Sequence, residues 1–483
     1  MSLATFINRR TCVRASALLI ILALALITRA FTAQFMLARL SDPQFFQPGT
    51  YAGFAAQAEN ALDGKTPYFW LDEGDAKESV QQCPGFSLWV AFIYKVSGER
   101  SARVVQRVQW VLDAFSVLLV FGIGLTAFGW RSGLIAGLLA SLSPMLVLYG
   151  TWPLADAPAS WLVLGGVWML LLSWKRESWR WALGAGLMLG ASCWMRANAL
   201  LLPLWCLPVL VLLARRKWRM IVPLCAALAL GVALSIMPIV IRNARAIGAF
   251  IPVRLGVGTL LWEGIGETER GAEFGAVASD DAVVEQERLE MKLAPDVPLG
   301  LFWPDGVRRD RERSHKALAV IVRHPVWFTG VMLGRMQGML DYTGYDSSTY
   351  GPSGFNVTTA LPQIKPSAPL TLLVRFLGVL QSALASLNLV LIAGGIMLAL
   401  YKDWRSSFLL LTIAIYYLVM NSIMHVEHRY NLPMHALLLV FAGFGLYRLI
   451  EILAELARKR RAPKTTPVTD GGEGVSATSG RAG

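Results

Sequence analysis

Charged side chains are scarce in this chain, and acidic ones are the scarcest. Only 16% of the 483 residues are charged, whereas 55% are hydrophobic, a balance that excludes an ordinary soluble protein. The 32 acidic residues are outnumbered by 45 Lys and Arg, which gives a net charge of +13. Such an excess can indicate nucleic-acid binding, but here the basic residues form short clusters beside apolar runs. We therefore interpret them as topology signals and expect no nucleic-acid partner.

Cysteine and histidine are almost absent, with five residues of each type. Cys193, Cys206 and Cys225 lie within apolar runs and Cys12 lies beside the first run, which leaves Cys83 alone in a polar connector. This distribution excludes a disulfide framework and contains no metal-ligand spacing. We therefore expect no cofactor and no metal site, although the sequence leaves a requirement for a divalent metal open.

Long apolar runs are the dominant feature of the sequence. Runs of roughly 18 to 25 residues recur, and such a length crosses ~30 Å of hydrocarbon as a helix. The sequence thus predicts an all-α polytopic membrane protein with about ten transmembrane helices. The first run follows a basic segment, as a signal peptide would, but it is long enough to be a retained helix. The spans are expected near 15–37, 104–128, 132–149, 157–174, 181–195, 198–213, 220–241, 371–400, 407–424 and 432–453.

The connectors between these runs alternate in charge. Every second connector is short and basic, and positive residues stay on the cytoplasmic side of a bilayer. We therefore expect a multi-pass protein of the inner (plasma) membrane with both termini in the cytoplasm. The remaining connectors carry the acids, histidines and aromatics, so an active site would face the periplasm or exterior. The basic set comprises Arg9, Arg10, Arg14, Arg131, Lys175, Arg176, Arg180, Arg215, Arg216, Lys217, Arg219, Lys402, Arg405 and 458–461.

Two of the outer connectors are long enough to carry structure of their own. Helical spacing is evident at 51–62, and the apolar stretches 84–96 and 325–340 are too short to span, so we expect them at the membrane interface. The chain is thereby divided into four regions. These are an N-terminal transmembrane module 1–241 with its outer loop at about 38–103, an outer loop 242–370, C-terminal transmembrane helices 371–455, and a disordered basic tail 456–483 that can contact membrane lipids.

Six charged residues fall within the predicted spans or at their outer ends. A charge at bilayer depth costs at least ~2.5–3.5 kcal/mol, so each needs a partner or a function. Because they gather toward one face, we expect them to line a polar cavity that opens outward. The six are Arg29, Arg107, Asp113, Asp156, Arg196 and Arg242.

Two of these six admit a plainer interpretation. Asp156 is the only charge in the shortest outer connector, where it could simply cap the N-terminus of the next helix. Arg196 could extend its head group to the interface without binding anything. The functional alternatives are a catalytic role for Asp156 and phosphate binding by Arg196.

The segment 425–433 is the strongest local cluster of polar groups. It places His425, Glu427, His428, Arg429 and Tyr430 between two long spans. A metal pair is weakly supported because only one carboxylate is present. An arginine oriented by Glu427 toward a phosphate is chemically more natural. The alternative is a solvated turn between helices.

Several stretches, taken in order, resemble membrane glycosyltransferases of the GT-C fold. The family in question includes the protein O-mannosyltransferases and the aminoarabinose transferases of lipid A. The resemblance is specific in its order rather than in any single motif, and it covers most of 15–450. Its stretches are 51–68, 83–86, 102–106, 128–137, 143–149 leading to Asp156, 195–203, Arg242–Asn243 with 250–252, and 427–433.

The resemblance implies a helical bundle with amphipathic outer helices over its active site. It also implies a sugar donor carried on a polyprenyl phosphate, and an envelope lipid, glycan or protein as the acceptor. Phosphate binding would fall to Arg196, Arg242 and Arg429. The supporting residues would be Tyr51, Asn243, His425, Glu427, His428 and Tyr430.

The catalytic base departs from the family pattern. In the family an Asp precedes the tyrosine of the first outer loop by a few residues, but here 47–50 carries no acid. The nearest upstream acid is Asp42, so either Asp42 or Asp156 would be the base. A transporter or flippase of a lipid-linked sugar, or a family member with altered chemistry, remains an alternative. The one-sided placement of polar groups argues against transport.

Overall fold

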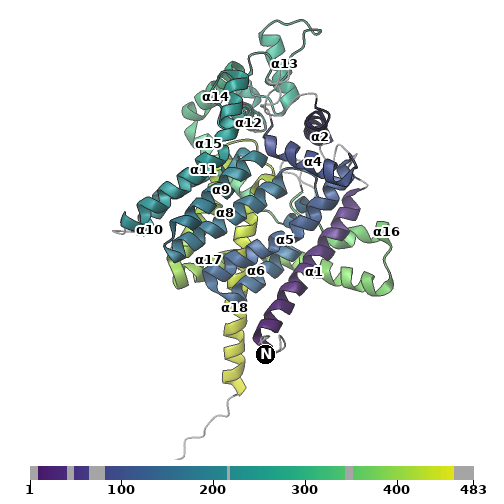
Figure 1. Cartoon of the computed structure of the whole chain (residues 1–483), viewed down its shortest axis with the longest axis vertical. Helices are drawn as coiled ribbons and strands as arrows, with labels where there is room; N and C mark the ends of the chain where they lie inside the picture. Colours follow the sequence, from purple (N-terminus) through teal and green to yellow (C-terminus); the bar gives the residue numbers. More distant parts are fainter. Residues whose placement is uncertain are drawn as a thin grey trace, which may run out of the picture.

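The computed structural model describes residues 9–37, 39–40, 48–64, 82–214, 218–342 and 352–461. Every regular element in these residues is a helix (Figure 1), so the predicted all-α class is confirmed. Within them, six helices are long and apolar enough to cross a membrane, or up to eight if each of two bent pairs counts as one span. The chain is a multi-pass membrane protein, although the predicted ten spans are not confirmed.

Short helices and bends account for the difference in the number of spans. At 1.5 Å per residue, α9 (17 residues) and α10 (13 residues) are too short to cross. The bend of 60° between α6 and α7 lies at Pro144, which lacks the N–H that a continuous helix needs. The predicted spans 371–400 and 407–424 lie on either side of a kink in the 55-residue α17, where Asp403 leaves helical geometry (φ −145°, ψ 80°).

The helices of the bundle have the following bounds. They are α1 Arg9–Leu37, α5 Ala102–Phe128, α6 Trp130–Leu142, α7 Pro144–Gly150, α8 Asp156–Arg176, α9 Trp179–Met195, η2 Ala197–Ala199, α10 Leu202–Ala214, α11 Trp218–Ile247, η4 Val357–Ala360, α16 Leu361–Ile364, α17 Ala368–Ser422, η5 His428–Asn431 and α18 Leu432–Arg461.

Helix α18 forms the centre of the bundle. Residues 431–445 are all buried, and a helix that is apolar and buried on every side must be surrounded by others. Its Phe441 and Phe444 pack against Phe128 of α5, with ring centroids 6.1 and 4.6 Å apart. The core therefore lies where α18 crosses α5, α6 and α17.

Glycines allow a close helix contact in the bundle, between α9 and α11. A Cβ at Gly186 would lie 2.2 Å from the carbonyl oxygen of Leu228, and one at Gly231 would lie 2.4 Å from that of Leu183. Small residues of this kind let backbones approach closely, which is how helices associate in a bilayer. The short α9 is thereby held against the long α11, and the end of α9 carries Arg196.

The outer segments gather at one end of the molecule (Figure 1). The beginning of α1 and the end of α18 lie at the opposite end. The outer helices are α2 Pro48–Leu62, α4 Pro84–Ser97, α12 Val257–Gly266, η3 Ala272–Phe274, α13 Asp280–Glu290, α14 Gly306–Arg323 and α15 Pro325–Met339.

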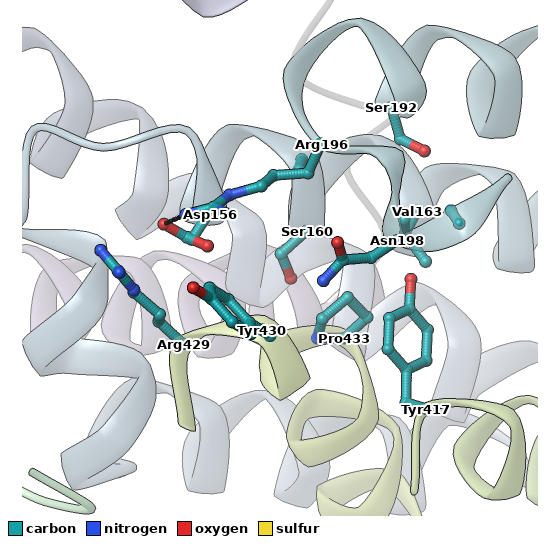
Figure 2. A pocket seen from close by; sticks show the side chains of 12 residues that line it. Asp156, Ser160, Val163, Ser192, Arg196, Asn198, Tyr417, Arg429, Tyr430 and Pro433 are labelled. Atoms are coloured by element: carbon teal, nitrogen blue, oxygen red, sulfur yellow. Dashed lines mark hydrogen bonds and ion pairs between the residues drawn. The ribbon is translucent and has the colours of Figure 1, made fainter. Parts of the chain in front are cut away.

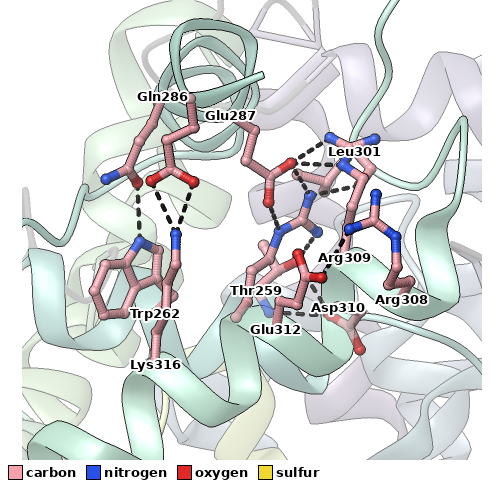
Figure 3. A network of polar contacts seen from close by, with 12 residues as sticks. Thr259, Trp262, Gln286, Glu287, Leu301, Arg308, Arg309, Asp310, Glu312 and Lys316 are labelled. Carbon is pink, nitrogen blue, oxygen red and sulfur yellow. Dashed lines mark hydrogen bonds and ion pairs between the residues drawn. The ribbon is translucent and has the colours of Figure 1, made fainter. Parts of the chain in front are cut away.

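A buried charge network joins α13 to α14 (Figure 3). The carboxylate of Glu287 accepts hydrogen bonds from Arg313 at 2.6 and 2.7 Å and from Arg309 at 2.7 Å. Both arginine side chains are only 2% exposed. Arg313 also donates to Thr259 of α12 at 2.9 Å. These charge-assisted bonds make α12, α13 and α14 one packed unit.

Candidate functional site

A large polar cavity lies between the outer helices and the outer ends of the spans. It has a volume of about 690 Å³, within the range of small-molecule sites. It is lined from α2, the start of α4, the end of α9, α12, α13 and the segment that precedes η5. The charged residues on its wall are Arg196, Arg254, Glu263, Asp280, Asp281, His425, Glu427 and Arg429.

Asp156 and Arg196 form an ion pair beside this cavity (Figure 2). A nitrogen of Arg196 lies 2.9 Å from Oδ2 of Asp156, and the two side chains are 18% and 4% exposed. Asp156 is the first residue of α8 rather than its N-cap, so the capping interpretation is wrong. Arg196 is held against Asp156 by this pair.

The predicted contact between Glu427 and Arg429 is present. Arg429 donates to Oε1 of Glu427 at 2.5 Å, and the Tyr430 hydroxyl donates to the same oxygen at 3.1 Å. The Tyr430 ring lies between two cations, with the guanidinium carbons of Arg196 and Arg429 4.8 and 5.3 Å from its centroid. Tyr430 thus joins the two arginines into one positive cluster through cation–π contacts.

His425 links this cluster to helix α12. Its Nδ1 contacts the carboxylate of Glu267, and its Nε2 lies 3.6 Å from Glu427. Burial disfavours the imidazolium, but the two carboxylates outweigh it and raise the pKa of His425 to about 11. Burial acts against ionisation of Glu427 too, yet Arg429 and His425 hold its pKa well below the usual range. Both groups are therefore charged at neutral pH.

The backbone around His425 is fixed to α12 as well. The His425 N–H donates to the Leu260 carbonyl at 2.9 Å. A Cβ on Gly264 would lie 2.8 Å from the His425 nitrogen, so only glycine allows this approach. Arg335 of α15, 5% exposed, donates to the carbonyls of Gly264, Ser422 and Met424. The arginine inside the predicted interfacial helix therefore has a bracing function.

Sequence reasoning missed two residues on this wall. Glu263 of α12 is only 6% exposed, and its Oε1 accepts no hydrogen bond from the described residues. Asp280, the first residue of α13, lies within hydrogen-bonding reach of the Glu263 carboxyl. The isolated Glu in the apolar run of α12 was a possible signal, but only the fold brings α13 beside it.

A third residue that was not predicted is Arg254, which adds to the positive end of the cavity. Burial raises the pKa of the Cys83 thiol, while the charges of Arg254, Arg196 and Arg242 act to lower it. Three arginines therefore surround one cavity-lining thiol. Arg242 itself is 3% exposed, and its neighbour Asn243 donates to the carbonyls of Ile251 and Val253 at 2.9 Å each, which fixes the chain leading to Arg254.

Not every predicted site residue lines the cavity. Tyr51 is hydrogen-bonded to Tyr94 at 2.8 Å, and its neighbours Gly53 and Phe54 face the cavity instead. His428 is buried but is not on the cavity wall. Asp42 lies outside the described residues.

The expectation that six buried charges form one cavity is only partly correct. Arg29 and Asp113 pair with each other at 2.6 Å, and Trp161 donates to the same Asp at 2.6 Å. This pair joins α1, α5 and α8 within the bundle and does not line the cavity. Arg107 is exposed on α5. A buried charge can be satisfied by another span as readily as by a ligand.

An apolar groove lies next to the arginine cluster. It has a volume of about 540 Å³ and runs between α10 and α17, with Leu204 64% exposed along it. Tyr416 lines the groove and donates to the Asn198 carbonyl at 2.7 Å. The next residue, Tyr417, lines the small pocket that also holds Asp156, Arg196 and Arg429 (Figure 2). Adjacent residues of α17 therefore connect the apolar groove with the charged site.

Comparison with known proteins confirms the expected resemblance. Residues 81–241 match the family model described as dolichyl-phosphate-mannose-protein mannosyltransferase. This region holds Cys83, Asp156 and Arg196. No curated protein matches the chain.

Solved structures show the same fold. The oligosaccharyltransferase of Archaeoglobus fulgidus in its apo form superposes with a TM-score of 0.51 at 13% identity, over 92% of this chain and 52% of that one. Two further structures of the archaeal enzyme match with a TM-score of 0.48. One is tethered to an acceptor peptide with the NVT sequon (13% identity, 92% and 51% coverage), and the other is in complex with an inhibitory peptide and a dolichol-phosphate (12% identity, 94% and 52% coverage). This chain thus spans about half the length of the solved structures it matches.

Proposed function

We propose that the protein is a membrane glycosyltransferase that moves one sugar from a polyprenyl-phosphate donor to an acceptor in the cell envelope. The acceptor is an envelope lipid, glycan or protein, and the reaction takes place on the non-cytoplasmic face. The family match over 81–241 and the GT-C fold support a transferase of this kind. The alternating basic connectors and the placement of the outer helices opposite the ends of α1 and α18 support the orientation.

The observation that carries the proposal is an apolar groove and an arginine pocket that are lined by consecutive residues of α17, Tyr416 and Tyr417. A polyprenyl phosphate has a long apolar tail and a doubly charged leaving group, so it needs both kinds of surface. The groove between α10 and α17 fits the tail, and Arg196 and Arg429 line the pocket that Tyr417 shares. Tyr416 and Tyr417 mark the boundary between the two surfaces.

The chemistry follows from the arginine positions. As the bond from the sugar C1 to the phosphate oxygen breaks, negative charge develops on the phosphate. Preorganised guanidinium groups in a site shielded from water stabilise such charge strongly. The Nε of Arg196 is buried and has no hydrogen-bond partner among the described residues, so it can donate to a phosphate while the ion pair with Asp156 stays intact. Glu427 holds the Arg429 guanidinium in place by accepting its hydrogen bond, as Asp156 does for Arg196.

The test uses membranes that contain the protein and a labelled polyprenyl-phosphate sugar. We expect release of polyprenyl phosphate together with an envelope product heavier by one sugar residue, detected by mass spectrometry. Arg196→Ala and Arg429→Ala should each reduce turnover by roughly a hundredfold or more, the size of losing one transition-state donor. Arg448→Ala, on the exposed end of α18, is the matched control and should leave turnover unchanged.

Two outcomes would contradict the proposal. Movement of intact donor across the bilayer without cleavage of the C1–O bond would identify a transporter instead. Equal turnover in the arginine variants and the control would show that the phosphate is bound elsewhere.

A further inference from the structure

Building on the proposed transferase function, we propose that Glu263 is the base that takes the proton from the acceptor hydroxyl, and that Asp280 is its positioning partner. From the sequence we expected Asp42 or Asp156 to be the base instead. Glu263 is buried and lies on the cavity wall, and three nearby carboxylates are ion-paired, whereas Glu263 forms no ion pair with any described residue.

Glu263 is a buried carboxyl group with one oxygen that the described residues leave without a hydrogen-bond donor. Its side chain is 6% exposed, it lines the 690 Å³ cavity, and its Oε1 has no hydrogen-bond donor among the described residues. An unpaired buried carboxylate is costly. Such a group is retained in a fold when a ligand supplies the missing hydrogen bond, and an acceptor hydroxyl in the cavity would do so.

The backbone holds Glu263 in one rigid frame with the proposed phosphate site. Its helix α12 is fixed to the segment before η5 by the bond from the His425 N–H to the Leu260 carbonyl at 2.9 Å. Arg335 ties the carbonyl of Gly264 to the end of α17. Glu263 and Arg429 therefore stand on the same braced unit and face the same cavity, as a base and a leaving-group site must.

Three other carboxylates of the site are already paired with cations. Asp156 pairs with Arg196 and Glu427 with Arg429, while Glu267 contacts His425. A carboxylate that is ion-paired in this way accepts a proton poorly. The nearest acidic partner of Glu263 is Asp280, a like charge.

This environment suits a base that works at neutral pH. Burial and then the charge of Asp280 raise the pKa of Glu263 to about 8, while His425 acts to lower it and Glu267 to raise it. Of the charged groups of α14, Arg313 and Asp310 bond to Thr259, one turn before Glu263 on α12, and Lys316 lies 6.0 Å from the ring centroid of Trp262. General bases are most effective when their pKa lies near the working pH.

The step balances without any further reactant. The acceptor oxygen attacks C1 of the sugar and forms the new C–O bond as its proton passes to the Glu263 carboxylate. The bond from C1 to the phosphate oxygen breaks, and its electron pair leaves on the polyprenyl phosphate. The protonated Glu263 then returns its proton to solvent through the cavity, which opens beside the exposed Asp280.

The experiment compares Glu263→Gln with Glu285→Gln in the transfer assay, using full-length protein in membranes. Glu285 is on α13 with a side chain 62% exposed, so it matches the substitution without touching the cavity. We expect Glu263→Gln to lower kcat by roughly 10²- to 10⁴-fold, the usual contribution of a general base. Binding of the labelled donor should be unchanged. Above pH 8, where Glu263 is ionised, the melting temperature should stay equal or rise because a buried charge is removed, whereas a purely structural residue would lower it.

A second variant tests the positioning role. Asp280→Asn removes the like charge, so the pKa of Glu263 should fall. The pH–rate profile, which rises as Glu263 ionises, should then shift toward lower pH while kcat at high pH is largely kept. An unshifted profile would remove Asp280 from the proposal.

The outcomes separate this inference from the proposed function. If the unmodified protein transfers no sugar, the proposed function fails. If it does transfer sugar and Glu263→Gln retains full turnover while Asp42→Asn or Asp156→Asn loses it, the function stands and Glu263 is not the base.

Discussion

Glu287 provides the sharpest test of how the outer helices are held together. The substitution Glu287→Gln keeps the shape of the side chain and removes its charge. In the native protein this carboxylate is the shared acceptor for Arg309 and Arg313, whose side chains are 2% exposed. The substitution therefore leaves two buried guanidinium groups without a counterion.

The magnitude follows from the hydrogen bonds in Figure 3. Oε2 accepts from Arg309 and from Arg313, and Oε1 accepts from Nε of Arg313 at 2.6 Å. A glutamine whose carbonyl takes the Oε2 position still accepts the hydrogen bonds from Arg309 and from Nη2 of Arg313. Its NH₂ group then faces the Nε–H of Arg313, so two hydrogen-bond donors point at each other. Breaking one partner of a buried ion pair costs about 3–5 kcal/mol. We expect a loss of that size for the unit formed by α12, α13 and α14.

The assay is hydrogen exchange of 257–323 in detergent micelles, which reports local opening as a free energy. The control is Glu290→Gln on the same helix, whose bond to Lys316 at 2.8 Å joins side chains that are 47% and 43% exposed. Exposed pairs of this kind contribute at most about 1 kcal/mol. Equal protection in the two variants would refute the reasoning, since it would show that the buried network adds nothing beyond a surface ion pair.

Three further predictions concern the packing, the groove and the effect of acid. Gly264→Ala places a Cβ 2.8 Å from the His425 nitrogen, so we expect roughly 1–3 kcal/mol of strain and a tenfold or greater loss of turnover. The control is Gly330→Ala, whose Cβ would have no atom within 4 Å, and it should leave turnover unchanged. Leu204→Trp narrows the apolar groove and should raise KM about tenfold for a long-chain donor but not for a short-chain analogue; equal KM values would place the tail elsewhere. The pKa of Glu287 is lowered because bonds from Arg313 and Arg309 outweigh its burial. Its stabilising contribution is therefore present above the unfolded-state pKa and is lost as pH falls through the folded-state value. Protection of the α13 amides from hydrogen exchange should decrease in acid, and it should decrease less in Glu287→Gln.

The sequence predicts the all-α class because apolar runs of membrane length have few other solutions in a bilayer. It also identifies the segment around Glu427, since charged residues between two spans need partners nearby in the chain. The number of spans is harder to predict. The predicted spans at 181–195 and 198–213 correspond to α9 and α10, of 17 and 13 residues, and hydropathy alone does not tell whether such short helices cross the membrane.

The pairing of distant charges was not predictable from the sequence. From the sequence we expected Asp113 to line the polar cavity, and only the crossing of α1 and α5 shows that Arg29 neutralises it. Glu263 is the opposite case. It stands 17 residues from Asp280 in the chain, yet the turn between α12 and α13 brings the two carboxyls within hydrogen-bonding reach, so a like-charge contact arises that no local pattern encodes.

The arrangement of the arginines explains how the site remains stable before any donor arrives. A lone buried guanidinium would be costly, and Arg196 is paired with Asp156 from another segment while Arg429 is paired with Glu427, two residues before it. The carboxylates also fix the guanidinium planes, so little rotamer entropy remains to be lost when a phosphate binds. Removal of Asp156 or Glu427 should therefore weaken phosphate binding even though it removes a negative charge from the site. A purely Coulombic account predicts the reverse, tighter binding after loss of the acid. Donor affinity in Asp156→Asn decides between the two, because a preorganised site loses affinity and an electrostatically limited one gains it.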